Sequence, residues 1–160
     1  MSEPVIVELQ AQPFAFVTLK SSLADMPTVI AQGFGTLSGL FARAGAQMAG
    51  IPMAHYLSFD RRVVSFELGF PVRASDSEKL RTVGLSIGHT PDGRNMTATH
   101  LGPYGTLSET YSAMDAAMRA RGVSGSEDMW ESYPSPPETP PEQVRTDVIW
   151  PLVATAAKQA

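Results

Sequence analysis

The chain of 160 residues contains no cysteine. Disulfide bonds, cysteine nucleophiles and thiolate metal sites are therefore excluded. Positive charge is also sparse, because 12 Lys and Arg stand singly or in pairs against 16 Asp and Glu, for a net charge of −4. A protein that binds nucleic acid directly carries its basic residues in a patch or stripe. We therefore expect no direct nucleic-acid binding.

Long apolar runs are missing as well. No window reaches the roughly 18 apolar residues that a membrane-spanning helix requires. The N-terminus also lacks the basic and apolar regions of a secretory signal. We expect a cytoplasmic protein without membrane association. With 43% hydrophobic and 18% charged residues, the composition is that of an ordinary globular protein, and residues 1–160 suit a single domain.

Metal ligands are not grouped in the sequence. The three histidines, His55, His89 and His100, lack the short spacing of zinc ligands. We therefore expect neither a metal nor a cofactor. His100 ends a predicted strand, and we interpret it as a structural histidine whose ring nitrogens find partners in the fold.

The first half of the chain alternates strand and helix signals. A helix is predicted to begin at Asp25, with Pro27 in its first turn, and to end at Gly50. Its apolar residues recur at steps of three and four. The predicted strands of this half are Val5–Leu9 and Phe14–Leu19, followed by a hairpin of His55–Phe59 and Val63–Phe70.

The second half repeats the pattern. Thr106 and Glu109 form a capping-box pattern that predicts a helix start, and Gly122 ends this helix. The predicted strands are Thr82–His89 and Asn95–Leu101, as a second hairpin around Pro91-Asp92-Gly93, and then Asp128–Tyr133 and Val144–Trp150. A proline-rich segment, Pro134–Pro141, joins the last two strands as a surface connection.

Two short identities link the halves. Gly35-Thr36-Leu37-Ser38 recurs as Gly105-Thr106-Leu107-Ser108, and Phe70-Pro71-Val72 corresponds to Trp150-Pro151-Leu152. The helix phases also agree between the halves. We therefore predict an α+β fold of two pseudo-symmetric strand–helix–strand–strand repeats, about 5–72 and 82–152, that form a curved antiparallel sheet. Two helices would pack against this sheet, leaving a ligand groove between the halves.

Glu131 is the most unusual residue of this pattern. Strand interiors disfavour Glu, and an ionised carboxylate away from water is costly unless a partner compensates it. Two interpretations stay open: the side chain reaches solvent or an arginine, or the carboxylate stands among aromatic rings to receive a cation. Strand alternation places Met129, Glu131 and Tyr133 on one face, and Trp130 on the other, where we expect it in a helix-packed core.

The remaining candidate ligand-binding residues are aromatic: Tyr56, Tyr104, Phe70 and Trp150. Tyr56 lies on the corresponding strand of the first half and would face the same groove as Glu131. Tyr104 precedes the second helix, at the rim of that groove. Phe70 could equally be a core residue, and core is the better interpretation of Phe66. Rings beside a carboxylate would stabilise a desolvated cation by about 0.5–2 kcal/mol each.

Four ordered motifs make the chain resemble a known family. They are Glu-Leu-Gly-Phe-Pro-Val at 67–72, His-Leu-Gly-Pro-Tyr at 100–104, Trp-Glu-Ser-Tyr at 130–133 and Thr-Asp-Val-Ile-Trp-Pro-Leu at 146–152. Together they resemble the GyrI-like effector-binding domain, which has the SOUL/GyrI-like fold. This is the ligand-sensing module of many AraC-type and MerR-type transcription regulators, and it also occurs alone.

The resemblance implies multidrug binding, with bulky, cationic or aromatic molecules held in the groove. The family's Glu, followed two residues later by Tyr, falls on Glu131 and Tyr133. Its closing strand commonly carries Tyr where this chain has Ile149, with Trp150 beside it, so the aromatic lid must be supplied differently. The chain has no room for a helix-turn-helix, and we expect a stand-alone sequesterer, or a sensor with a protein partner that the sequence does not identify.

The resemblance also leaves two other functions open. Some stand-alone relatives hydrolyse reactive electrophiles, and Glu131 could then act as general base. The sequence offers one candidate base and no second catalytic group, so a non-enzymatic function is preferred. Inhibition of a DNA enzyme such as gyrase would follow from the family name alone.

Overall fold

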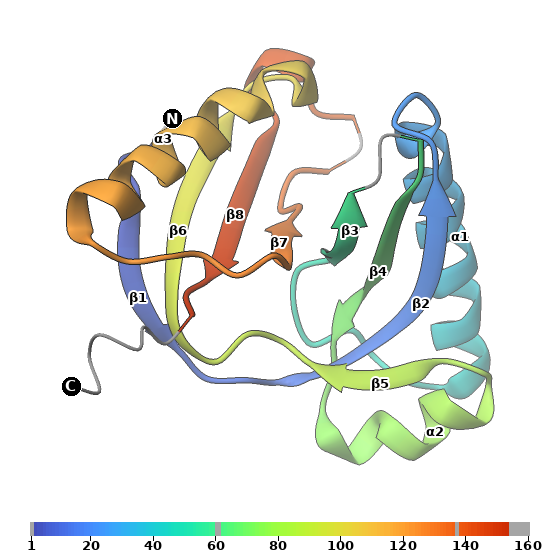
Figure 1. The fold of residues 1–160 in the computed structure, drawn as a ribbon. Coiled ribbons are helices and arrows are strands. Elements are labelled where there is room, and N and C mark those ends of the chain that lie inside the picture. The colour runs from blue at the N-terminus through green and yellow to red at the C-terminus, as the bar shows by residue number, and fades with distance from the viewer. Residues whose placement is uncertain (1, 60–61, 137, 154–160) are drawn as a thin grey trace. The chain divides into compact units, whose positions relative to one another are not determined.

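The computed structural model describes residues 2–59, 62–136 and 138–153, which divide into two compact units. The first unit is Gln10–Thr90, and the second unit combines Met1–Leu9 with Pro91–Ala160. Each unit contains four antiparallel strands and at least one helix (Figure 1).

The first unit orders its strands β3-β4-β2-β5. Its strands are β2 (Pro13–Ser21), β3 (Met53–Phe59), β4 (Val64–Pro71) and β5 (Ser86–His89), and its helices are α1 (Met26–Ala44) and α2 (Ser77–Thr82), the latter preceded by the 3-10 turn η1 (Ala74–Asp76). In Figure 1, α1 runs along β2 and β4. The alternation of β4 directs Phe66, Leu68 and Phe70 to the side of α1, where all three are buried.

Helix α1 begins as predicted and ends earlier than predicted. Asp25 occupies the predicted N-cap position, but its side chain makes no capping hydrogen bond within the described part of the chain. The helix ends at Gly45, in a left-handed conformation with φ 66°, five residues before the predicted Gly50. A Cβ at Gly33 would lie 2.7 Å from Leu68 Cδ2, so close approach to the sheet explains this glycine.

The second unit orders its strands β1-β6-β8-β7. Its elements are β1 (Val5–Leu9), β6 (Gly93–Leu101), η2 (Tyr104–Thr106), α3 (Leu107–Arg121), β7 (Met129–Ser132), η3 (Pro141–Gln143) and β8 (Arg145–Pro151). Its core joins Met114 and Met118 of α3 to buried residues of β6 and β8, namely Met96, Ala98 and Val148. Figure 1 shows α3 lying over β6, and the strand residues of this core pack against the helix.

The predicted internal repeat is confirmed in strand order. The first unit contains β2, α1, β3 and β4 with the order β2-β4-β3, and the second contains β6, α3, β7 and β8 with the order β6-β8-β7. Pro71 pairs with Phe14 at the end of β4, as Pro151 pairs with Asn95 at the end of β8. The α+β class and the strand–helix–strand–strand repeat are therefore those that the sequence predicts.

Two outer strands pair differently from the prediction. The predicted hairpin of Thr82–His89 with Asn95–Leu101 is wrong, because β5 pairs with β2 while β6 pairs with β1 and β8. Val5–Leu9 accordingly pairs with the second repeat. The segment around Ser75-Asp76-Ser77, for which the sequence predicts no helix or strand, forms η1 and the start of α2.

None of the helices in the described residues is long and apolar enough to cross a membrane.

Candidate ligand-binding site

The register of β7 with β8 places Glu131 beneath helix α3. Glu131 pairs with Val148, and residues directly opposite in an antiparallel pair project from the same face. Val148 packs in the core with Met114 and Met118 of α3, so Glu131 projects toward that helix. Its side chain is nearly withdrawn from water, with 6% of the residue exposed.

Two phenols hold the carboxylate of Glu131. Tyr111 of α3 donates to Oε2 at 2.6 Å, and Tyr133 donates to Oε1 at 2.8 Å. The 2.6 Å contact of Tyr111 is in the range of charge-assisted O–H···O hydrogen bonds, and the 2.8 Å contact of Tyr133 has the ordinary length of an O–H···O hydrogen bond. Each contributes about 1.5–3 kcal/mol, which offsets part of the several kcal/mol that burying an ionised carboxylate costs.

A third phenol, Tyr104, completes the surroundings. Its ring meets that of Tyr133 edge to face, with centroids 6.3 Å apart. Burial, and secondly the negative charge of Glu131, raise the pKa of Tyr104 above its ordinary value, so the phenol stays protonated at neutral pH. Tyr104 is 55% exposed, and it is therefore the ring of this group that a molecule from solvent meets first.

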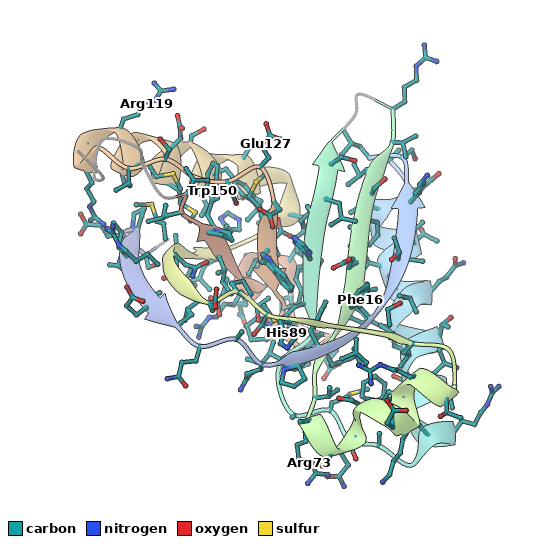
Figure 2. All side chains as sticks on the ribbon, turned by 60° about the horizontal axis from the view of Figure 1, so that its bottom comes forward. Phe16, Arg73, His89, Arg119, Glu127 and Trp150 are labelled. Atoms are coloured by element: carbon teal, nitrogen blue, oxygen red, sulfur yellow. The ribbon has the colours of Figure 1, made fainter. Side chains whose placement is uncertain are left out.

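Trp150 of β8 packs against Tyr111, one of the two phenols that hold Glu131. Its ring contacts Tyr111 edge to face, with centroids 5.9 Å apart, and its indole N–H donates to the carbonyl of Ser126 at 2.8 Å. A Cβ at Gly125 would overlap the indole Nε1, so only glycine leaves room for this ring. Figure 2 shows Trp150 beside the ribbon of α3.

We refer to Tyr104, Tyr111, Glu131, Tyr133 and Trp150 as the Glu131 cluster. Four of these residues were candidates from the sequence, and the structure brings them together within the second unit. Tyr111 was missed, because it was interpreted only as one of the core-facing residues of its helix. A signal existed: in the predicted helix it lies four residues after Leu107 and three before Met114, on the face that meets the strand of Glu131.

The other two candidates lie in the first unit. Tyr56 is buried, and its ring contacts Phe66, with centroids 5.9 Å apart. Phe70 contacts Phe34 and Phe41 of α1, with centroids 5.8 and 5.6 Å away. Phe66 is a core residue, as predicted. The ligand-binding roles of Tyr56 and Phe70, like the groove between the halves, stay predictions.

Two neighbours of Glu131 in sequence and in the sheet point away from α3. Trp130 pairs with Ile149, one step along each strand from the pair that faces the helix. Trp130 is a buried core residue, as predicted, and it projects from the face opposite α3. Ile149 projects from that face too.

The arrangement is a buried acid surrounded by ring faces and phenolic donors. Such a site can stabilise a positive charge through the carboxylate and through the ring quadrupoles. Within the residues that the structure describes, no group of three or more His, Asp or Glu could hold a metal ion.

Comparison with known families gives a match over almost the whole chain. Residues 2–153 match the family model described as the GyrI-like small molecule binding domain. No curated protein matches the chain significantly in sequence.

Solved structures show the same fold at low sequence identity. The C-terminal domain of EcmrR is similar with a TM-score of 0.75 and 13% identity, over 95% of this chain and 98% of that chain. A hydrolase encoded by lin2189 from Listeria innocua gives a TM-score of 0.67 and 15% identity, over 94% of this chain and 92% of that one. SAV2435, solved with bound tetraphenylphosphonium, gives 0.63 and 11%, over 99% and 97%.

Proposed function

Because the chain belongs to the GyrI-like small molecule binding domain family, we propose that it binds bulky organic cations reversibly at the Glu131 cluster. It would act as a sequesterer, or as a sensor that works through a partner protein. The observation that carries this proposal is a carboxylate, 6% exposed, whose two oxygens accept hydrogen bonds from Tyr111 and Tyr133. The tetraphenylphosphonium bound to the similarly folded SAV2435 supports the choice of a cation.

The hydrogen bonds of Glu131 also favour one kind of cation. A primary ammonium group needs acceptors for its three N–H donors, and each oxygen of Glu131 already uses one of its two lone pairs to accept from a phenol. A phosphonium or quaternary ammonium ion has no N–H group to satisfy. It gains from the negative potential and the ring faces without competing for these hydrogen bonds. We therefore expect lipophilic cations without N–H donors to bind more tightly than ammonium ions of equal size.

A matched pair of ligands tests the proposal. Methyltriphenylphosphonium and triphenylphosphine oxide carry the same three phenyl rings, but only the first is charged. Isothermal titration calorimetry should show tighter binding of the phosphonium, and mass spectrometry should recover it unchanged. Equal affinity for both compounds, or no binding of either, would contradict the proposed function.

Hydrolysis of reactive electrophiles is the second candidate. Its support is the fold shared with the Listeria innocua hydrolase and the presence of an acid beside phenolic donors. Glu131 would accept a proton from water while the water oxygen bonds to the electrophilic carbon and the bond from that carbon to its leaving atom breaks; the leaving atom then takes up the proton. Two donors on the carboxylate stabilise its charged form and so oppose the gain in basicity that burial gives it. This places hydrolysis second.

Turnover separates the two candidates. Excess strained or electrophilic aromatic compound is incubated with a small amount of protein, and the products are identified by mass spectrometry. Reversible binding predicts that the compound is recovered intact. Several turnovers per protein molecule, lost in Glu131→Gln, would establish the hydrolase instead.

A further inference from the structure

His100, at the end of β6, is the centre of a buried hydrogen-bond network next to the Glu131 cluster. The residue is 4% exposed. Its Nδ1 lies 2.9 Å from the hydroxyl of Thr110 in α3. Its Nε2 lies 3.1 Å from the carbonyl of Pro103 and 3.1 Å from the hydroxyl of Thr106. One imidazole thus joins a strand, a helix and the segment that connects them.

The partners assign the tautomer of His100. A carbonyl oxygen only accepts, so Nε2 carries the proton and donates to Pro103. Thr106 also donates to the Pro103 carbonyl, at 3.0 Å, which leaves its oxygen able to accept from Nε2. In the neutral imidazole Nδ1 is then the acceptor, and the Thr110 hydroxyl donates to it. The two nitrogens therefore differ in role, because Nε2 holds the connecting segment and Nδ1 holds the helix.

The network replaces the N-cap hydrogen bond that the sequence predicts for the hydroxyl of Thr106. Thr106 and Glu109 predict a capping box, and Thr106 does occupy the N-cap position of α3. However, its side chain makes no capping hydrogen bond among the described residues and contacts His100 and Pro103 instead. An N-cap hydrogen bond stabilises a helix by about 1 kcal/mol. The start of α3 forgoes this contribution for contacts that fix the connecting segment.

The connecting segment, residues 102–106, carries Tyr104. Gly102 begins the segment with φ 123°, a conformation that favours glycine, and its N–H donates to the carbonyl of Val144 at 2.8 Å. His100 holds the segment at Pro103 and at Thr106, one residue before and two residues after Tyr104. Between these contacts the exposed Tyr104 ring is directed onto Tyr133.

We propose that His100 is a positioning residue, whose Nε2 holds the 102–106 segment so that Tyr104 stays against Tyr133 as the outer ring of the Glu131 cluster. This inference rests on the proposed function only for its effect on ligand affinity, because the position of Tyr104 can be measured without ligand.

Two substitutions at His100 separate its two nitrogens. In His100→Gln the side-chain amide nitrogen reaches the place of Nε2 and can donate to Pro103. In His100→Asn the shorter side chain reaches only the place of Nδ1. It keeps an acceptor for Thr110 but loses the hydrogen bonds that Nε2 makes with Pro103 and Thr106. The chain has four tyrosines, so labelling their ring carbons gives a simple NMR spectrum, in which Tyr104→Phe assigns the Tyr104 signal.

Without ligand, His100→Asn should shift the Tyr104 signal and lower the pKa of Tyr104 toward its ordinary value, while His100→Gln keeps both. With methyltriphenylphosphonium, His100→Asn should bind about 2- to 30-fold more weakly than the native chain, the range for loss of one ring–cation contact. His100→Gln should bind within about twofold of the native chain, since its contact with the segment is retained. Thermal denaturation of both variants measures their folding.

Either of two results would overturn the inference. Equal shifts of the Tyr104 signal in both variants would mean that His100 only fills the core, and no shift in either would mean that the segment holds itself. If His100→Asn does not fold, Thr106→Val replaces it, since it removes only the hydroxyl that bridges Nε2 and Pro103. Suppose that the Tyr104 signal shifts in His100→Asn but not in His100→Gln, and that the protein binds no cation. This result would refute the proposed function and leave the positioning role of His100 intact.

Discussion

Replacing Glu131 with Gln removes one negative charge while keeping nearly the same side-chain shape. In the native chain Glu131 accepts from Tyr111 and Tyr133, one phenol on each oxygen. The amide of Gln can accept from one phenol and donate to the oxygen of the other, because a phenol is both donor and acceptor. We therefore expect Glu131→Gln to fold and to keep both contacts as neutral hydrogen bonds.

The loss of affinity follows from the burial of this charge. With 6% of the residue exposed, the carboxylate is poorly screened by solvent, so a bound cation feels most of its charge. Two opposite unit charges about 6 Å apart attract each other by about 3 kcal/mol at an effective dielectric constant of about 20, and by less at larger separations. We expect methyltriphenylphosphonium to lose about 1–3 kcal/mol, or roughly 5- to 150-fold in affinity.

The assay compares two ligands and two variants by isothermal titration calorimetry. Triphenylphosphine oxide, which is neutral, should bind Glu131→Gln and the native chain alike. Glu127→Gln is the control variant, because it makes the same change of net charge at an exposed residue outside the cluster (Figure 2). Its small effect should disappear in high salt, whereas that of Glu131→Gln should persist. The reasoning would be refuted if the ratio of the affinity for methyltriphenylphosphonium to that for triphenylphosphine oxide were the same in Glu131→Gln as in the native chain.

Three further predictions concern the surroundings of the site. In Glu131→Gln the pKa of Tyr104, followed by alkaline NMR titration, should fall but stay above its ordinary value, because burial is the larger cause of its rise and remains; an unchanged pKa would place Glu131 electrically apart from Tyr104. Thr146→Val should raise the free energy of unfolding by about 1–3 kcal/mol in urea, because it removes a buried hydroxyl that lacks a hydrogen-bond partner among the described residues; a loss of stability would mean that the hydroxyl is satisfied. Gly125→Ala should lower the free energy of unfolding by about 1–3 kcal/mol and change Trp150 fluorescence, because the new methyl group must displace the indole; native fluorescence and stability would show that the ring has room.

The repeat could be predicted because it rests on signals carried by short segments. Helix phase, the glycine that ends the second helix at Gly122, and the prolines that end β4 and β8 can all be read in the sequence. The pairing of β1 and β5 could not. A strand records which of its faces is apolar but not which strand pairs with it, so a nearby turn such as Pro91-Asp92-Gly93 suggested a hairpin that the chain does not form.

The sequence predicts the acid of the candidate site, Glu131, but not one of the residues that donate a hydrogen bond to it, Tyr111. Glu131 is conspicuous because a strand interior seldom contains an acid. Tyr111 is inconspicuous because a tyrosine on the apolar face of a helix already has a sufficient role in the core, where its ring does pack. Only the register of β7 with β8 brings the hydroxyl of that ring to the carboxylate. The capping box predicted at Thr106 does not form for a related reason: the hydroxyl of Thr106 is hydrogen-bonded to His100 on the preceding strand.

The same facts explain why the tyrosines must act together. Alone, Glu131 beneath a helix would carry an uncompensated charge, at a cost of several kcal/mol. The phenols of Tyr111 and Tyr133 stabilise the charge by donating hydrogen bonds, and the ring of Tyr133 in turn receives the edge contact of Tyr104. A phenol donates through its hydroxyl and still presents a ring face with negative potential to a cation. Tyrosine can therefore hold the acid and contact the ligand at once, which phenylalanine and serine each do only in part.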